Sequence, residues 1–116
     1  MGKEVKLIKV IDNPEVDVPG HTFCTAKEIA GDLLGIDTYA LKLGFFGKGG
    51  TAVEHTHAES EHVFYVLAGS LTVTADGKEN TAQAGEALHI PAGIPHSAKN
   101  SNDGETTYIA LTLPPT

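Results

Sequence analysis

Three of the six histidines in this chain lie within eight positions, at His55, His57 and His62. Alternate side chains of a β-strand share a face, so the imidazoles of His55 and His57 are expected to point to the same side. His62 follows a short polar segment and precedes the apolar run 63–67. Neutral imidazole is a ligand for most divalent transition metals, so this spacing indicates a metal site built from two adjacent strands. Taken alone, the cluster is equally typical of a solvent-exposed hairpin with incidental histidines.

A second segment, 85–96, supplies a fourth candidate ligand. It ends in His96, which follows a turn with Pro91, Gly93 and Pro95. Proline fixes its own φ and glycine tolerates a positive φ, so this combination predicts a rigid turn. Such a turn would deliver His96 to a fixed position at the start of another strand, as a metal site built from distant segments requires.

Length, charge and cysteine content narrow the class of protein. The 116 residues fit a single domain, 1–116, with one core. A net charge of −7 and the absence of arginine argue against nucleic-acid binding. No apolar run approaches the ~20 residues that cross a bilayer, and the first residues lack an apolar signal core, so we expect no membrane partner and a cytoplasmic protein. Cys24, the single cysteine, is expected to be a small buried apolar residue.

The positions of turn residues predict the fold class. Glycine, proline, asparagine and aspartate recur at short intervals along the whole chain, with short β-type runs between them. That pattern is typical of an all-β sandwich or barrel. Residues 13–20 are expected to form a loop, and 23–31 an irregular strand or a helical turn. The expected strands span 5–11, 39–46, 52–57, 62–67, 70–75, 79–84, 87–90, 95–100 and 106–113.

Alternation along these strands predicts which side chains face inward. In 39–46 the apolar residues occupy odd positions and Lys42 lies between them, so the odd positions are expected to face the interior. His21, in a loop, and His89, between two apolar residues, are expected not to be ligands. The expected inward residues are Leu41, Leu43, Phe45, Val53, Phe64, Val66, Leu88, Ile90, Ala98 and either Tyr108 with Ala110 or Ile109 with Leu111.

Together, the two histidine segments resemble the two sequence boxes of the cupin family. The first box is matched by Gly49, His55, His57 and Gly69. The second is matched without a gap by Gly85, Pro91, Gly93, His96 and Asn100. The resemblance covers about 39–113 and implies the cupin-type double-stranded β-helix, a jelly-roll barrel.

One position departs from the cupin pattern. Most cupins carry glutamate at the position that is His62 here, with six residues between it and Gly69, whereas Glu61 stands one place earlier. Neighbours on a strand face opposite ways, so only one of the two can point inward, and the spacing to Gly69 favours His62. Four neutral imidazoles would leave the site at +2, which strengthens the Lewis acidity of the metal. The resemblance then implies one divalent metal (Mn, Fe, Ni, Zn or Cu) bound by His55, His57, His62 and His96.

The resemblance leaves the reaction open. Similar cupins include metal-dependent dioxygenases, isomerases and lyases that act on small molecules. A binding or sensing module with the same barrel is the alternative, and an intact ligand set argues against a domain that has lost its site. The resemblance also implies a homodimer, for which the apolar segment 5–11 could be shared between copies.

The expected pocket is apolar and suits a small, weakly polar organic ligand. Phe45, Phe64 and Tyr108 are candidates for its wall, and Tyr39 and Tyr108 are its available hydroxyl groups. Glu61 is a candidate hydrogen-bond partner for a ligand imidazole.

Overall fold

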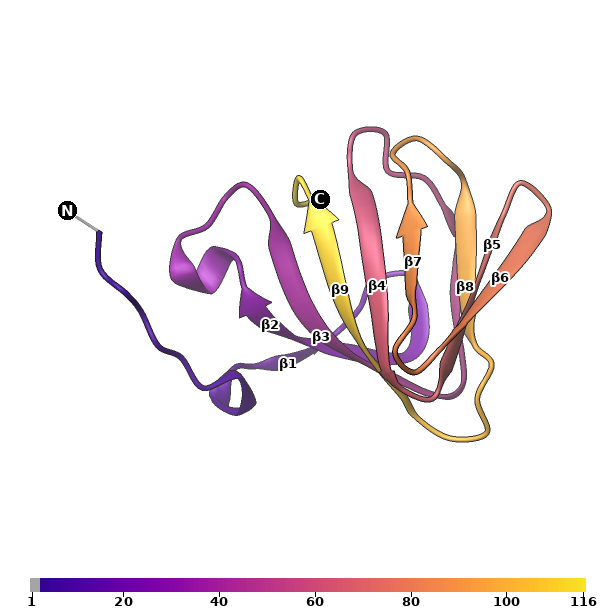
Figure 1. Cartoon of the computed structure of the whole chain (residues 1–116), viewed down its shortest axis with the longest axis horizontal. Helices are drawn as coiled ribbons and strands as arrows, with labels where there is room; N and C mark the ends of the chain where they lie inside the picture. The colour runs from indigo at the N-terminus through magenta and orange to yellow at the C-terminus, as the bar shows by residue number, and fades with distance from the viewer. Residues whose placement is uncertain (1–2) are drawn as a thin grey trace.

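The alternating apolar residues and frequent turns of the sequence produce an antiparallel β-structure in the computed structural model, which describes residues 3–116. Figure 1 shows these strands curving around a common interior to form a nearly closed barrel. No helix in the described part of the chain is long and apolar enough to cross a membrane. The elements are η1 (Val10–Asp12), β1 (Glu15–Asp17), β2 (His21–Ala30), η2 (Asp32–Leu34), β3 (Ala40–His55), β4 (Glu61–Ala68), β5 (Ser70–Ala75), β6 (Lys78–Gln83), β7 (Ala87–Ile90), β8 (His96–Asn100) and β9 (Thr106–Leu113).

The long strand β3 joins the two sides of the barrel. The strand order is β6-β5-β8-β3-β9-β4-β7, and β2 pairs with β3 while β1 pairs with β2. The first half of β3 pairs with β9, and the second half pairs with β8. Gly49, with φ of 76°, lies where β3 changes from one partner to the other. A positive φ is accessible to glycine at little cost, so this residue lets one strand serve both sides.

The all-β architecture expected from the sequence is present, but the bounds of several expected segments differ. The segments 39–46 and 52–57 belong largely to one strand, β3, because the glycines between them form no turn. The segment 23–31, expected as an irregular strand or a helical turn, lies mostly in β2 and is thus the first of these alternatives. The expected strand 5–11 pairs with no other strand in the described structure; the first strand, β1, instead lies inside the expected loop 13–20.

The inward face of β3 is the reverse of the one expected. Gly44 and Phe46 are buried, whereas Leu41, Leu43 and Phe45 lie on the outer side and are half-buried. A Cβ on Gly44 would overlap the ring of Tyr108, so the inward face needs a glycine there. Glycine gives no apolar signal, and the outward face therefore looks more hydrophobic in the sequence than the inward one.

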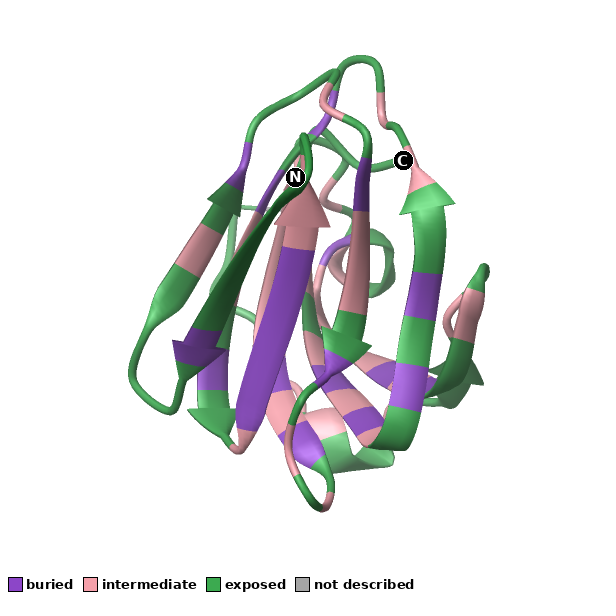
Figure 2. Cartoon of the chain, turned by 90° about the vertical axis from the view of Figure 1, so that its right-hand side faces the viewer, coloured by how far each residue is buried: buried purple, intermediate pink, exposed green. Residues whose placement is uncertain are grey.

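The core lies on the inner side of the barrel, and buried and exposed positions alternate along several strands (Figure 2). Cys24 is buried, as expected for a small apolar residue, and its Sγ lies 3.4 Å from Oη of Tyr108. Burial raises the pKa of this thiol, which keeps it neutral. The buried cluster comprises Cys24, Phe46, Val66, Leu71, Ala82 and Tyr108.

Asn100, at the end of β8, holds the loop between β8 and β9. Its Nδ2 lies 3.0, 2.9 and 2.7 Å from the carbonyl oxygens of Phe46, Gly47 and Gly104. Its Oδ1 accepts hydrogen bonds from the amide of Asn102 at 2.9 Å and from Oγ1 of Thr106 at 2.7 Å. One buried amide thus satisfies backbone groups of β3 and of the loop, together with the hydroxyl group of Thr106 at the start of β9.

Candidate metal centre

Three strand ends bring four histidines to one end of the barrel. His55 is the last residue of β3, and it lies directly opposite His96, the first residue of β8, in the ladder between them. His57 follows two residues after β3 ends, and His62 is the second residue of β4. The closest pair of rings is His55 and His96, with centroids 4.3 Å apart, followed by His57 and His62 at 4.7 Å.

A β-bulge turns His55 inward. In the β3–β8 ladder Ala52 pairs with Ala98 and His55 pairs with His96, so three steps on β3 match two on β8. An extra residue of this kind shifts the alternation by one. Ala52 and His55 therefore both face the cavity, while Val53 between them is 64% exposed rather than inward as expected.

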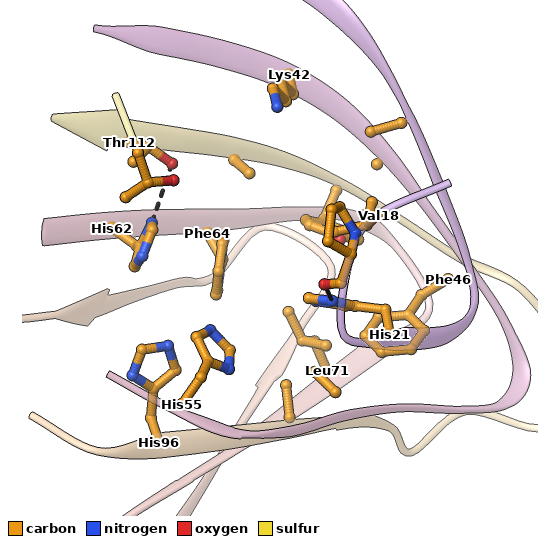
Figure 3. Close-up of a pocket in the computed structure, with 18 of the residues that line it drawn as sticks. Val18, His21, Lys42, Phe46, His55, His62, Phe64, Leu71, His96 and Thr112 are labelled. Carbon is orange, nitrogen blue, oxygen red and sulfur yellow. Dashed lines mark hydrogen bonds between the residues drawn. The ribbon is translucent and has the colours of Figure 1, made fainter. Parts of the chain in front are cut away.

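The nitrogens of three histidines are close enough together to share a metal ion. One ring nitrogen from each of His55, His57 and His96 lies within 4.8 Å of the other two. His62 is outside that group and extends from the facing wall toward it, with its ring centroid 5.8 Å from that of His96 (Figure 3). Imidazole suits Zn, Cu, Fe and Ni, so the chemistry of this donor set fits a divalent transition metal.

Hydrogen bonds on the far side of the rings fix which nitrogen is free. Nδ1 of His55 donates to the carbonyl oxygen of Val53 at 2.7 Å, and Nδ1 of His96 donates to that of Ile94 at 2.9 Å. A carbonyl oxygen can only accept, so in the neutral rings Nε2 keeps its lone pair. Nδ1 of His62 lies 3.0 Å from Oγ1 of Thr112. Such partners are typical of histidines that bind metals through the other nitrogen.

His62 carries the clearest sign of a missing ligand. His62 is 7% exposed, and its Nε2 is buried with no hydrogen-bond partner among the described residues. A buried polar atom without a partner destabilises the fold, so such atoms call for an explanation. Burial, and after it the proximity of His57, His96 and His55, lowers the pKa of His62 to about 4. The ring is neutral at physiological pH and available as a ligand.

The pKa values of His57 and His96 are lowered as well. Burial lowers the pKa of His57, with the neighbouring His55 and His96 adding to the effect. Burial also lowers the pKa of His96, although the hydrogen bond to the carbonyl of Ile94 opposes the shift. Mutual repulsion of the imidazolium forms therefore favours a neutral group of rings.

These shifts predict that the metal-free protein loses stability in acid. The pKa of His62 is about 4 in the folded protein and ~6.5 in the unfolded chain, so the unfolded chain binds more protons between these values. The contribution of neutral His62 is fully present above pH ~6.5 and is lost as the pH falls from ~6.5 to ~4. Urea unfolding of the chelator-treated protein should show this decline, and His62→Gln should make it shallower. An equal slope in the two proteins would contradict the prediction.

The four histidines open onto a cavity of about 320 Å³ inside the barrel. Phe64 of β4 and Tyr108 of β9 line it, together with Ala98 and Ala110. Phe45 does not line it, since Phe46 takes the inward place on β3. The other lining residues include Val18, His21, Ala26, Lys42, Gly44, Phe46, Ala52, Leu71 and Thr112.

The polar groups of three candidate residues lie elsewhere than expected. Oη of Tyr108 lies 3.4 Å from Sγ of Cys24 in the core, so Tyr108 offers its ring to the cavity, and burial raises its pKa. Glu61 is exposed, and its Oε1 lies 2.9 Å from Nε2 of His89, outside the cavity. Tyr39 is half-buried and does not line the cavity.

The cavity also contains two residues that the sequence did not indicate as part of the site. His21 starts β2, beside Phe46 and at the other end of the cavity from His62 (Figure 3). Its Nδ1 donates to the carbonyl oxygen of Pro19 at 2.8 Å, which leaves Nε2 free. Lys42 lies on the inward face of β3 although the sequence placed it outside. No sequence signal marks His21, because its place depends on the pairing of β2 with β3, opposite Ala52.

A family comparison decides between the all-β folds that could hold such a site. The family model described as a cupin domain matches residues 44–112, more than half of the chain. The chain belongs to the cupin family. The match covers all four histidines of the candidate metal centre and most of the strands that line the cavity.

This cupin has relatives with several activities. A quercetin 2,3-dioxygenase of Bacillus subtilis (strain 168) is 40% identical over 50 residues, 43% of this chain and 15% of its own length. The β-D-galactosidase Rv1717 of Mycobacterium tuberculosis is 27% identical over 112 residues, 96% of each chain. The polyketide cyclase RemF of Streptomyces resistomycificus has a similar solved structure, with a TM-score of 0.83 and 25% identity, covering 97% of this chain and 81% of RemF. The chain thus spans only a small part of the dioxygenase.

Proposed function

We propose that this cupin binds one divalent transition metal through His55, His57, His62 and His96. The observation that carries the proposal is the buried, unpartnered Nε2 of His62, which belongs to a ring beside the imidazoles of His57 and His96. A shared metal ion would satisfy this atom. Glu61, the other candidate for the third ligand, lies outside the cavity on the adjacent position of β4.

We further propose that the metal centre serves an enzyme that acts on a small, largely apolar organic substrate bearing an oxygen ligand. When bound, the metal would supply a Lewis acid that polarises this oxygen, and four neutral ligands leave its full charge available. An apolar wall lies beyond the histidines and is formed by the rings of Phe46 and Phe64 and the side chain of Leu71. That wall excludes water and holds a hydrocarbon skeleton.

The remaining polar groups of the cavity would orient such a substrate. Nε2 of His21 accepts a hydrogen bond, since Nδ1 is committed to Pro19. Burial lowers the pKa of His21, which keeps this nitrogen unprotonated at neutral pH. Lys42 offers an ammonium group to the cavity from the inward face of β3. A substrate with an oxygen function at each end matches these positions.

The activities named for two relatives support an enzyme over a non-catalytic module. One is a dioxygenase named for quercetin, and the other is a cyclase named for polyketides. The dioxygenase, isomerase and lyase classes expected from the sequence include such reactions. Metal-dependent oxygen uptake or turnover of a phenolic or polyketide-like compound would establish an enzyme, whereas saturable binding of that compound without turnover would establish a binding module.

The ligand set is tested by comparing two neighbouring substitutions. His62→Ala should reduce the metal content of the purified protein, because it removes the unpartnered Nε2 of a ring that lies beside those of His57 and His96. Glu61→Ala is the matched control, which removes only a contact with the exposed His89 and should keep about one metal per chain. Elemental analysis of both proteins gives the answer. Loss of metal in Glu61→Ala with retention in His62→Ala would assign the third ligand to Glu61.

A further inference from the structure

The barrel is open along one seam, between β6 and β7, the two end strands of the sheet. A tight turn joins these strands, and within it the amide of Glu86 donates to the carbonyl oxygen of Gln83 at 2.9 Å. Beyond the turn, the described residues form no ladder between β6 and β7, and the β5–β6 hairpin leans away from β7 (Figure 1). A cavity of about 200 Å³ lies at this seam, and we call it the seam pocket.

The seam pocket shares no lining residue with the cavity onto which the four histidines open, here called the histidine cavity. Val73 of β5 pairs with Ala98, and Leu88 of β7 pairs with Phe64. Both partners line the histidine cavity, and paired residues share a face of the sheet, so Val73 and Leu88 point into the barrel. The apolar wall of the seam pocket consists of Val73, Ala75, Leu88, Ile90 and Ile94.

Two polar side chains, Lys78 and Asn80, join this apolar wall from β6. Lys78 pairs with Ala75, and Asn80 pairs with Val73. These pairings place both polar residues on the inward face of the β5–β6 hairpin, where a barrel interior ordinarily has apolar side chains. Neither side chain forms a hydrogen bond or an ion pair with another described residue, so both keep their donors for a ligand.

The positive charge of Lys78 is not neutralised by the carboxylates around it. Glu79, the next residue, faces the other side of the hairpin, and its Oε2 lies 3.3 Å from Nζ of Lys99. Oε1 of Glu61 lies 2.9 Å from Nε2 of His89, at the rim of the pocket. The pocket therefore presents one free ammonium group beside an apolar surface, which is complementary to an anion with a hydrocarbon body.

We propose that the seam pocket binds a small monocarboxylate whose other end is a branched or cyclic hydrocarbon. Lys78 and Asn80 are two positions apart on one face of β6, ~7 Å along the strand, so each can donate to one oxygen of a carboxylate. The hydrocarbon lies against Val73, Leu88 and Ile90. The volume of about 200 Å³ is below the ~300 Å³ at which sites for drug-sized ligands begin, so the acid is compact. Binding at this site requires no metal.

Benzoate is a probe of this size and charge. Two-dimensional NMR of the isotope-labelled full-length chain should show saturable shifts of the amide signals of 78–80 and 88–90, with a dissociation constant of about 1 mM or lower. Lys78→Gln removes the charge from an exposed position and should weaken binding about tenfold or more. The absence of saturable shifts in these two segments would overturn the proposal, as would an unchanged affinity in Lys78→Gln.

The matched control, Lys42→Gln, changes the ammonium group of the histidine cavity instead. It should keep the affinity for benzoate within about twofold of that of the parent protein, since Lys42 does not line the seam pocket. Weaker binding in Lys42→Gln with an unchanged affinity in Lys78→Gln would place benzoate in the histidine cavity and refute the proposal.

A second variant and a neutral probe test the two halves of the pocket. Asn80→Leu fills the pocket from an exposed position without changing a charge, and it should abolish binding. Retained binding in Asn80→Leu would show that benzoate lies elsewhere. Benzyl alcohol keeps the ring but lacks the carboxylate, and it should bind about tenfold more weakly than benzoate. Equal affinities for the two probes would refute the role of Lys78 in holding a carboxylate.

Discussion

His57→Ala is expected to lower the affinity of the protein for its metal by more than about 100-fold, the loss typical of removing even an outer partner of a ligand. One nitrogen of His57 is within 4.8 Å of those of His55 and His96, and its ring centroid is 4.7 Å from that of His62. The ring makes no hydrogen bond to another described residue and is half-buried, so its removal leaves the fold intact. Competition with a chromophoric chelator measures the affinity directly.

His89→Ala is the control for this experiment. His89 is also a histidine next to the barrel end, but its ring is exposed and contacts Glu61 instead of the other rings. His89→Ala should keep the metal affinity within about twofold of that of the parent protein, since exposed ion pairs contribute little to stability. Equal metal affinities in the parent and His57→Ala proteins would remove His57 from the ligand set.

Asn100→Ala is expected to lower the free energy of unfolding by about 4 kcal/mol, because it leaves several buried backbone groups unpaired at ~1 kcal/mol or more each. Nδ2 of Asn100 lies within 3.0 Å of three carbonyl oxygens, and Oδ1 accepts two further hydrogen bonds. Alanine can replace none of these contacts. For a domain of this size the loss corresponds to a melting temperature lower by ~15 °C. Urea and thermal unfolding of the chelator-treated proteins measure both quantities.

Asn80→Ala provides the matched comparison. Asn80 is exposed on β6 and forms no side-chain hydrogen bond to another described residue, so its loss should change stability by less than ~0.5 kcal/mol. Similar unfolding midpoints for Asn100→Ala and Asn80→Ala would contradict the prediction, because they would show that the hydrogen bonds of Asn100 add little to the free energy of unfolding. Asn100 closes the second cupin sequence box, and the structure gives that position a physical role.

Local signals in the sequence were sufficient to predict the fold class and the proximity of the histidines in the folded chain. Turn residues and short β-type runs predict the all-β barrel, and the spacing of His55, His57 and His62 indicates one cluster. His96 follows a proline-rich turn, and its strand pairs with the strand of His55. These features depend on residues close together in sequence, or on motifs that the cupin resemblance connects.

Features that depend on long-range pairing could not be predicted in this way. The bulge after Ala52 turns His55 inward and Val53 outward, and it is defined by the register with β8. The inward face of the first half of β3 was assigned to the wrong residues because Gly44 lies beneath Tyr108, 64 positions later in the sequence. His21 reaches the cavity only through the pairing of β2 with β3.

The alternation along β3 ties the interior of the barrel to its exterior. Even positions of its first half line the cavity, and the odd positions Leu41, Leu43 and Phe45 lie on the outer side of the sheet. Deleting or inserting one residue in this half would exchange the two sets, since strand periodicity is two. A single change of this kind would therefore alter the cavity wall and the outer surface of the sheet together.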